Sequence, residues 1–185
     1  MGNFQHGNTA DIAYLRECLH YEPETGDFYW KLRPRHHFPN ENIWKTINTR
    51  NGGTKAGSIS NNGYVTIRLT GKLHLAHRLA WMFMWGTPIP PGREIDHINR
   101  NKADNRFKNL RLATRGQNGF NSKRKRNTKL PKNVCFDRGK NKYVVWVRAY
   151  GKQHFIGRFE TIEEASVAAT EAREKLHGRF CYHDT

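Results

Sequence analysis

The stretch EIDHINRNKADNRFKNLRLATRGQN, from Glu94 to Asn118, decides how the rest of the chain is organised. It opens with a short strand that closes on Asp96 and His97, and a polar loop follows. Asn109 stands just before residues 110–113, which alternate like a second strand. A Thr-x-x-Gln capping box then opens a short helix. The order strand, loop, strand, helix therefore sets a carboxylate, an imidazole and carboxamides at defined points.

These residue types suit the handling of a cation and a proton. Asp96 and Asn118 offer oxygen ligands, which hard divalent cations prefer. Successive side chains of a strand point to opposite faces, so His97 can act as a general base while Asp96 holds the cation. Asn109 is uncharged and is expected to bridge backbone groups across the loop, which fixes where His97 points. The alternative is a polar hairpin whose Asn and Asp residues only serve turns.

The spacing of these residues resembles that of a known family. Asn109 and Asn118 follow His97 by twelve and twenty-one residues, within the longer run DHIN-x-N-x-x-DNR-x-x-NLR-x-AT-x-x-QN. This run resembles the HNH endonucleases of the phage and intron homing type. The resemblance implies a ββα-metal fold that hydrolyses DNA phosphodiesters, with His97 and Asn109 as catalytic residues and Asp96 and Asn118 as metal ligands. Many relatives carry His at the last position; Asn118 favours Mg²⁺, or else Mn²⁺, over Zn²⁺.

Composition limits the choice of partner. The chain has 185 residues, and 32 Lys and Arg against 16 Asp and Glu give a formal net charge of +16. Such an excess predicts a polyanionic partner, double-stranded DNA first and an anionic membrane second. RNA binding would follow from charge alone, and no motif supports it. No small-molecule cofactor is expected.

Cysteine usage and hydropathy suggest a compartment. The three cysteines are far apart and form no CxxC pair, which argues against a disulfide framework and fits a reducing cytoplasm. The most apolar stretch, Leu79 to Trp85, is too short to cross a bilayer, and no signal-peptide pattern opens the chain. We expect no membrane association and a cytoplasmic location, in the host cell if the protein is phage-encoded.

A small scaffold of strands and helices is predicted ahead of the motif. Thr9 to His20 shows helical spacing with Thr9 as the N-cap, and Phe28 to Lys31 resembles a strand. Residues 33–54 are rich in Pro, Asn and Gly, and we expect mostly loop there. The Asn62-Gly63 step predicts a hairpin. His77 to Trp85 is expected to form a buried helix that ends at Gly86.

Two histidine pairs lie in this scaffold. His36 and His37 could ligate a metal, or could simply be a solvated pair in a loop. His74 and His77 stand three residues apart, which is also compatible with metal ligation. A histidine of a scaffold helix is more often part of the hydrogen-bonded core, and we expect the latter role for both.

A basic segment follows the motif. Residues 121–132 contain six basic residues and no acidic one. Each phosphate that a basic residue neutralises releases counterions, so such a segment can lie along a DNA backbone. We predict phosphate contacts for Lys123, Arg124, Lys125 and Arg126. The alternative is a solvated charged linker.

The C-terminal part has the pattern of three strands followed by a helix. Strands are predicted at 134–138, 143–150 and 153–159, and Thr161 caps a helix over 162–177. The pattern, including G-K-x-x-x-I-G-x-F and T-x-E-E-A, resembles the plant ethylene-response-factor DNA-binding domain, whose sheet lies in the major groove. By alternation, Val144, Trp146, Arg148 and Tyr150 share one strand face. The resemblance places four residues at DNA-facing positions: Trp146, Arg148, Gln153 and Phe155. Lys132 and Arg138 are predicted to contact the DNA backbone.

This chain departs from that family at two positions. Cys135 replaces a usual basic residue and Trp146 an often acidic one, so the plant target sequence does not carry over. Trp146 could instead belong to the core between sheet and helix.

Together these patterns predict an α+β protein in three parts. The parts are an HNH endonuclease domain over 9–121 with its ββα-metal core at about 93–121, a basic linker over 122–131, and a three-stranded antiparallel sheet packed on one helix over 132–180. The predicted function is divalent-metal-dependent hydrolysis of duplex DNA. One active site per chain makes a nick the simplest product, by a monomer or a homodimer. The alternative is a non-catalytic DNA-binding regulator that uses the C-terminal domain.

Overall fold

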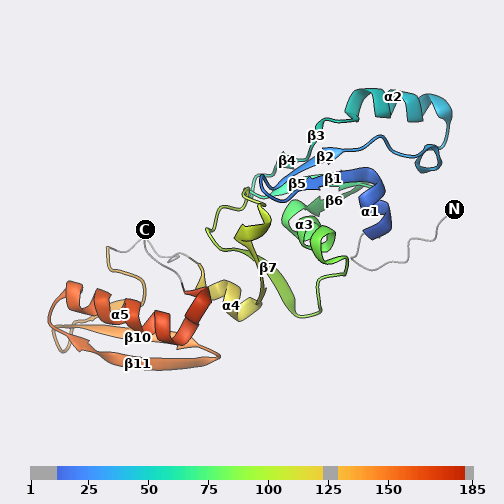
Figure 1. Cartoon of the computed structure of the whole chain (residues 1–185). Coiled ribbons are helices and arrows are strands. Elements are labelled where there is room, and N and C mark those ends of the chain that lie inside the picture. The colour runs from blue at the N-terminus through green and yellow to red at the C-terminus, as the bar shows by residue number, and fades with distance from the viewer. Residues whose placement is uncertain (1–11, 123–128, 182–185) are drawn as a thin grey trace. The chain divides into compact units, whose positions relative to one another are not determined.

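The computed structural model describes residues 12–122 and 129–181 as a mixed α/β protein of small sheets and helices (Figure 1). The chain divides into two compact units, an N-terminal unit of residues 1–112 and a C-terminal unit of residues 113–185. The division falls inside the strand, loop, strand, helix segment. The predicted domain limits of 9–121, 122–131 and 132–180 remain predictions.

The N-terminal unit is built from short elements. In chain order they are α1 (Ile12–Cys18), β1 (Leu19–Glu22), β2 (Asp27–Trp30), the 3-10 turn η1 (Arg35–His37), α2 (Glu41–Asn51), β3 (Lys55–Ala56), β4 (Ser58–Ile59), β5 (Val65–Leu69), β6 (Lys72–Leu75), α3 (Ala76–Trp85), β7 (Arg93–His97) and η2 (Phe107–Asn109). Two three-stranded sheets have the orders β1-β2-β3 and β4-β5-β6, and β7 pairs with β8 (Leu110–Thr114).

One apolar core holds this unit together. Leu15 of α1, Phe28 of β2, Ile67 of β5, Leu79 of α3 and Ile95 of β7 are all buried in it. As predicted, α3 is a buried helix that ends at a glycine in the left-handed conformation. Because Ile95 belongs to this core, β7 is fixed in position two residues ahead of its final histidine. The core therefore sets the direction of the Asp-His pair.

The first hairpin of the chain supports the polar loop of residues 98–109. The hydroxyl of Tyr21 donates to the backbone oxygen of Asn105 over 2.7 Å, and the Phe107 amide donates to the Pro23 oxygen over 2.9 Å. Gly26 turns the hairpin at φ +80°, and a Cβ there would lie 2.3 Å from the backbone nitrogen of Arg106. The hairpin and the loop thus approach so closely that only a glycine fits between them.

Two predictions about the scaffold are wrong. The first helix ends at Cys18 rather than at His20, because Leu19 is buried as the first residue of β1; Thr9 lies outside the described residues. Residues 33–54 are not mostly loop, since they contain η1 and the eleven-residue helix α2. No residue of α2 is buried, and its short apolar set of Ile43, Trp44 and Ile47 is surrounded by the Asn and Gly residues that led to the loop prediction. The predicted turn at Gly63 is confirmed between β4 and β5.

The C-terminal unit contains the short helix α4 and a three-stranded sheet covered by one helix. After β8 its elements are α4 (Arg115–Phe120), β9 (Val134–Asp137), β10 (Lys142–Ala149), β11 (Lys152–Phe159), α5 (Ile162–His177) and the 3-10 turn η3 (Gly178–Phe180). The sheet has the order β11-β10-β9, and α5 covers one of its faces (Figure 1). The predicted capping boxes are present, at Thr114 for α4 and at Thr161 for α5. The three strands and the helix are thus confirmed as elements.

The core between this sheet and α5 is made of small side chains. Val134, Val145 and Val147 face Ala165 and Ala169, and all five are fully buried. Trp146 does not belong to this core, since 37% of its surface is exposed. The alternative that assigned Trp146 to the sheet–helix core is therefore wrong. Among the described residues, no helix combines the length and the apolar character that a membrane crossing requires.

Candidate active site

His97 is held in a buried position at the end of β7. Its Nε2 lies 3.2 Å from Oδ1 of Asn105, which is itself buried. The Asn105 Nδ2 atom donates to the Ala103 oxygen over 3.3 Å, which turns Oδ1 toward the imidazole. Because an amide oxygen only accepts, Nε2 of His97 must carry the proton. The lone pair of the neutral ring then lies on Nδ1.

Burial also keeps the His97 ring neutral. It lowers the pKa of His97 below the ordinary value, and this outweighs the opposite effects of the Asn105 hydrogen bond and of the Asp96 charge. The ring therefore retains a proton-accepting nitrogen at neutral pH and somewhat below it. A histidine in this state has the protonation that a general base requires.

Asn109 ties the two ends of the polar loop together. Its Oδ1 accepts from the Asn99 amide over 2.9 Å, and its Nδ2 donates to Asn99 Oδ1 and to the Asp104 backbone oxygen over 2.9 and 2.8 Å. Its backbone oxygen accepts from the Ile98 amide over 2.8 Å. The loop segment just after His97 is thus attached to the residue that immediately precedes the return strand β8.

Asp104 strengthens the same loop from within. Its carboxylate accepts from the Arg106 guanidinium and from Asn99 Nδ2. The Arg106 hydrogen bond lowers the pKa of Asp104 to about 2, so the carboxylate stays ionised throughout the neutral range. The loop is therefore internally cross-linked on both sides of Asn105.

Asp96 carries a cationic partner on the neighbouring strand. Arg111 of β8 donates to Asp96 Oδ2 through Nε over 2.8 Å, and its Nη2 lies 2.7 Å from the same oxygen. Both side chains are largely buried. Asp96 and His97 contact different neighbours, as the strand alternation predicts. The Asp96 carboxylate is thus arranged to face positive charge.

Asn118 stands on α4, which belongs to the C-terminal unit, whereas Asp96, His97 and Asn109 belong to the N-terminal unit. The capping box of Thr114 and Gln117 starts this helix one residue after Thr114 and so sets Asn118 on its fourth position. Asn118 is partly exposed. The metal role predicted for Asp96 and Asn118 stays a prediction.

Two further aromatic side chains surround His97. The ring of His77 from α3 lies 4.8 Å from that of His97, nearly perpendicular to it, and Tyr64 lies 5.2 Å from His77. Burial lowers the pKa of His77 to about 3, and its Nδ1 has no hydrogen-bond partner among the described residues. His77 is thus core, as predicted, but its Nδ1 lacks the expected hydrogen bond. It packs as a neutral ring against the histidine of the motif.

Sequence reasoning missed Asn105, Arg111 and the contact of His77 with His97. Asn105 is one of several polar residues in the loop, and nothing in its spacing distinguishes it from Asn99 or Asn101. Arg111 could have been found, because β8 pairs with β7 and a cross-strand basic residue is the usual partner of an inward carboxylate. The His77 contact joins two elements and leaves no local pattern.

Comparison with known proteins bears on this geometry. A model of the HNH endonuclease family matches residues 74–120, which run from β6 to the end of α4. An uncharacterized HNH endonuclease of Acanthamoeba polyphaga mimivirus is 33% identical over 122 residues, which are 66% of this chain and 63% of that protein. Protein 3.8 of Escherichia phage T7 is 36% identical over 94 residues, 50% of this chain and 77% of that protein. Residues 74–120 of the chain are an HNH endonuclease family domain. No solved structure matches it significantly.

The family match ends at Phe120, so most of the C-terminal unit lies beyond it. There, one sheet face is turned away from α5. We define the exposed sheet face by the side chains of Cys135, Trp146, Arg148, Gln153, Phe155 and Arg158. Trp146 is paired with Phe155 across the strands, their rings are 4.9 Å apart, and the Arg158 guanidinium lies 5.1 Å from the Phe155 ring centre.

A groove of about 300 Å³ lies on this face. Its lining includes Trp146, Arg148, Gln153 and Cys135. The structure therefore brings four of the six predicted C-terminal contact residues onto one surface: Trp146, Arg148, Gln153 and Phe155. Val144, which alternation also assigns to this face, is buried.

The remaining predicted DNA-contact residues lie elsewhere or cannot be described. Arg138 is exposed in the turn after β9. The ammonium of Lys132 donates to the backbone oxygens of Phe120 and Ser122 and so holds the end of α4. Lys123, Arg124, Lys125 and Arg126 lie outside the described residues.

Proposed function

We propose that this chain is a divalent-metal-dependent DNA endonuclease that binds duplex DNA and hydrolyses phosphodiester bonds. The observation that carries the proposal is the buried, neutral His97 at the end of β7, whose Nε2–H is fixed by Asn105 within a segment of the HNH family. A buried neutral imidazole can also be mere packing, as His77 is; the position of His97 in the family-matched segment favours the catalytic role over the regulator.

His97 acts as the general base in this proposal. Its Nδ1 takes the proton of a water molecule, and the resulting hydroxide attacks the phosphorus atom. Asn105 Oδ1 accepts a hydrogen bond from the Nε2–H group throughout, so the ring keeps one tautomer and one orientation. Asn109 holds the loop that carries this arrangement, through its hydrogen bonds to Asn99 and Asp104. The rigidity of the loop supplies positioning, which is worth large factors in rate.

Asp96 and Asn118 would hold the cation. A carboxylate oxygen and an amide oxygen form a hard donor set, which suits Mg²⁺ first and Mn²⁺ second. In the structure Arg111 pairs with Asp96 Oδ2, so a cation at this oxygen would have to share it with the guanidinium or displace it. When bound, the cation would stabilise the charge that develops on the phosphate and on the leaving 3′ oxygen.

The C-terminal unit supplies DNA binding in this proposal. The exposed sheet face presents aromatic and basic side chains together, as the face of an ethylene-response-factor-like domain would. Trp146 and Phe155 can contact sugars or bases, and Arg148 can pair with a guanine edge or a phosphate. The net charge of +16 provides the sequence-independent attraction to the duplex.

We further propose homing-type activity with a single nick per event in the cytoplasm of a host cell. One His97 per chain supports cleavage of one strand, and two strands would need two chains or two visits. The mimivirus and phage relatives favour a viral setting for such an enzyme.

A plasmid assay tests the proposal. Supercoiled plasmid is incubated with the chain in Mg²⁺, in EDTA, and with His97→Ala in Mg²⁺. Open-circle product that disappears in EDTA and in His97→Ala is the expected result, with gel-shift affinity unchanged in the variant. A linear product would indicate that both strands are cut by paired active sites, instead of a single nick. Equal cleavage by His97→Ala would overturn the mechanism, and tight binding without any cleavage of target DNA would favour the regulator.

A further inference from the structure

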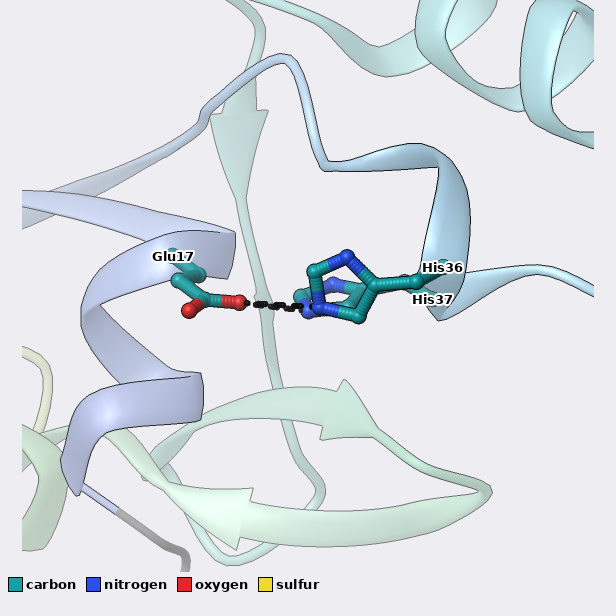
Figure 2. Close-up of side chains that lie close together, drawn as sticks. All are labelled: Glu17, His36 and His37. Atoms are coloured by element: carbon teal, nitrogen blue, oxygen red, sulfur yellow. Dashed lines mark hydrogen bonds and ion pairs between the residues drawn. The ribbon is translucent and has the colours of Figure 1, made fainter. Parts of the chain in front are cut away.

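Three potential metal ligands converge near the start of the N-terminal unit, away from the Asp96-His97 pair. Glu17 comes from α1, and His36 and His37 come from η1 (Figure 2). Oε2 of Glu17 lies 2.7 Å from Nε2 of His37 and 3.6 Å from Nε2 of His36. One ligand atom from each residue lies within 4.8 Å of the other two. Figure 2 shows both imidazoles directed at the same carboxylate.

The spacing of these atoms differs from that of a simple hydrogen-bonded cluster. The 2.7 Å contact is a normal hydrogen bond, but 3.6 Å is too long for one. Ligands around a tetrahedral ion with bonds of about 2.1 Å lie roughly 3.4 Å from each other. The His36 distance is close to this value, whereas the 2.7 Å hydrogen bond of His37 would be replaced by the ion and that pair would move apart. Neighbouring residues of a 3-10 turn ordinarily point in directions about 120° apart. Here His36 and His37 are neighbours whose Nε2 atoms nevertheless converge on one oxygen.

His37 is held in the orientation that a ligand requires. Its side chain is only 3% exposed, its ring lies 4.5 Å from that of Tyr14, and its Nδ1 lies 3.7 Å from Sγ of Cys18. Metal-bound histidines commonly have their second nitrogen fixed by such a neighbour. Cys18 contacts the nitrogen remote from Glu17 and therefore supports His37 rather than joining the ligand set.

The cluster is also accessible to an ion. The side chains of Glu17 and His36 are 46% and 72% exposed, which leaves room for an ion to enter and for water to complete its coordination. Of the nearby guanidinium groups, that of Arg33 interacts with the Cys18 thiol and lies over the Trp30 and Phe38 rings. Two others donate to backbone oxygens. Arg16 donates to the Phe83 oxygen over 3.0 Å, and Arg35 donates to the Phe38 oxygen over 2.6 Å.

We propose that Glu17, His36 and His37 bind one Zn²⁺ ion that fastens η1 to α1. Two imidazoles and one carboxylate, with water in the open position, are a donor set that zinc accepts. Imidazole ligands favour Zn²⁺ over Mg²⁺, so this site and the all-oxygen set of Asp96 and Asn118 select different ions. The bound ion stabilises the N-terminal unit and orders the chain leading into α2. This inference does not depend on the proposed nuclease activity.

Calorimetric titration of the full chain with ZnCl₂ tests the site, in a large excess of Mg²⁺ that occupies hard oxygen sites. The variants are Glu17→Gln and His36→Ala, both at exposed positions where the fold tolerates change. His20→Ala is the matched control, because His20 is an exposed histidine of β1 that lies near a different carboxylate, Glu22.

The wild type and His20→Ala are expected to bind one more equivalent of Zn²⁺ than the two cluster variants, or to bind that equivalent at least tenfold more tightly. Zn²⁺ should also raise the unfolding temperature of the wild type and of His20→Ala only. Far-UV circular dichroism without metal should be the same for all four proteins. Identical zinc titrations of all four, or no zinc binding by the wild type, would overturn the proposal.

Discussion

The Asp96-His97 site and the exposed sheet face differ in how much of their chemistry meets solvent. At the former, Asp96, His97, Asn105 and Asn109 are all buried, and each has defined hydrogen-bond or ionic partners within the chain. On the exposed sheet face, aromatic and basic side chains stand in water above a core of small residues. Chemistry on a scissile bond depends on positioning, whereas a DNA contact surface depends on access. Substitutions at the Asp96-His97 site should therefore lower the cleavage rate, whereas those on the exposed sheet face should lower the affinity for DNA.

The sharpest test concerns the residue that orients His97. Asn105→Ala removes the acceptor at Nε2, so the ring loses its fixed tautomer, and we expect the cleavage rate to fall about 100-fold or more. The affinity for DNA should not change. Single-turnover cleavage and gel-shift titration of the same preparation measure the two quantities.

Asn105→Asp distinguishes positioning from simple structural damage. It retains an acceptor but brings a negative charge beside the ring, which raises the pKa of His97. The acid limb of its pH–rate profile should therefore move to higher pH than in the wild type. An unmoved limb, or equal rates for Asn105→Ala and the wild type, would remove Asn105 from the mechanism.

The second effect concerns the contact between the first hairpin and the polar loop. Gly26→Ala adds a methyl group 2.3 Å from the Arg106 nitrogen at a positive φ, and we expect a loss of about 3 kcal/mol in the free energy of unfolding. Gly53→Ala is the control, because Gly53 has a similar φ of +77° and nothing within 4 Å. Urea titration compares them. If both variants lose the same stability, the close approach has no energetic role beyond backbone conformation.

The third effect concerns the buried rings behind His97. Because the folded pKa of His77 is about 3 and the unfolded value is near 6.5, the unfolded state binds the proton first as the pH falls. The stability from keeping His77 neutral is therefore complete above about pH 6.5 and is lost progressively below it, at up to about 1.4 kcal/mol per pH unit.

His77→Leu removes this titration. Between pH 7 and pH 5 the wild type should lose about 2 kcal/mol more unfolding free energy than His77→Leu does. Urea unfolding at the two pH values gives the difference. Parallel losses in both proteins would mean that His77 is accessible to protons in the folded state.

The smallest effect is expected on the exposed sheet face. Arg148→Ala should weaken binding to duplex DNA by about tenfold and reduce the slope of log affinity against log salt by about one, while cleavage persists at high protein concentration. Lys175→Ala is the control, since it removes one exposed charge from α5, on the other side of the sheet. If Arg148→Ala and Lys175→Ala show the same DNA affinity and the same salt dependence, this face is not a DNA contact.

The elements with strong local signals were predicted well. The buried helix before Gly86, the capped helix after Thr161 and the strand pair around the polar loop all carry apolar periodicity or a specific cap. Helix α2 was missed because it has neither a buried face nor a long apolar pattern. It is capped by Asn40 and held by hydrogen bonds from Trp44 and Asn48 to the Arg33 oxygen.

The chemistry of the site was predictable only in part. The motif singled out Asp96, His97, Asn109 and Asn118 because their spacing is fixed along the chain. The partners of His97 depend on how separate elements meet: Asn105 through the folding of the loop, and His77 through the packing of α3. The convergence of Glu17 with His36 and His37 is likewise a tertiary event between α1 and η1. Residue spacing along the chain does not reveal such contacts between separate elements.

The hairpin that rests on the polar loop bears on how this protein can be divided. The family-matched segment begins at residue 74, yet Tyr21 and Pro23 hold the backbone at Asn105 and Phe107. A fragment cut to the limits of the match would therefore leave behind the part of the chain that shapes its own reactive loop. Domain exchange or fusion in this protein should keep α1, β1 and β2 with the HNH segment. The segment that should be transferred as a unit is therefore longer than the family-matched segment.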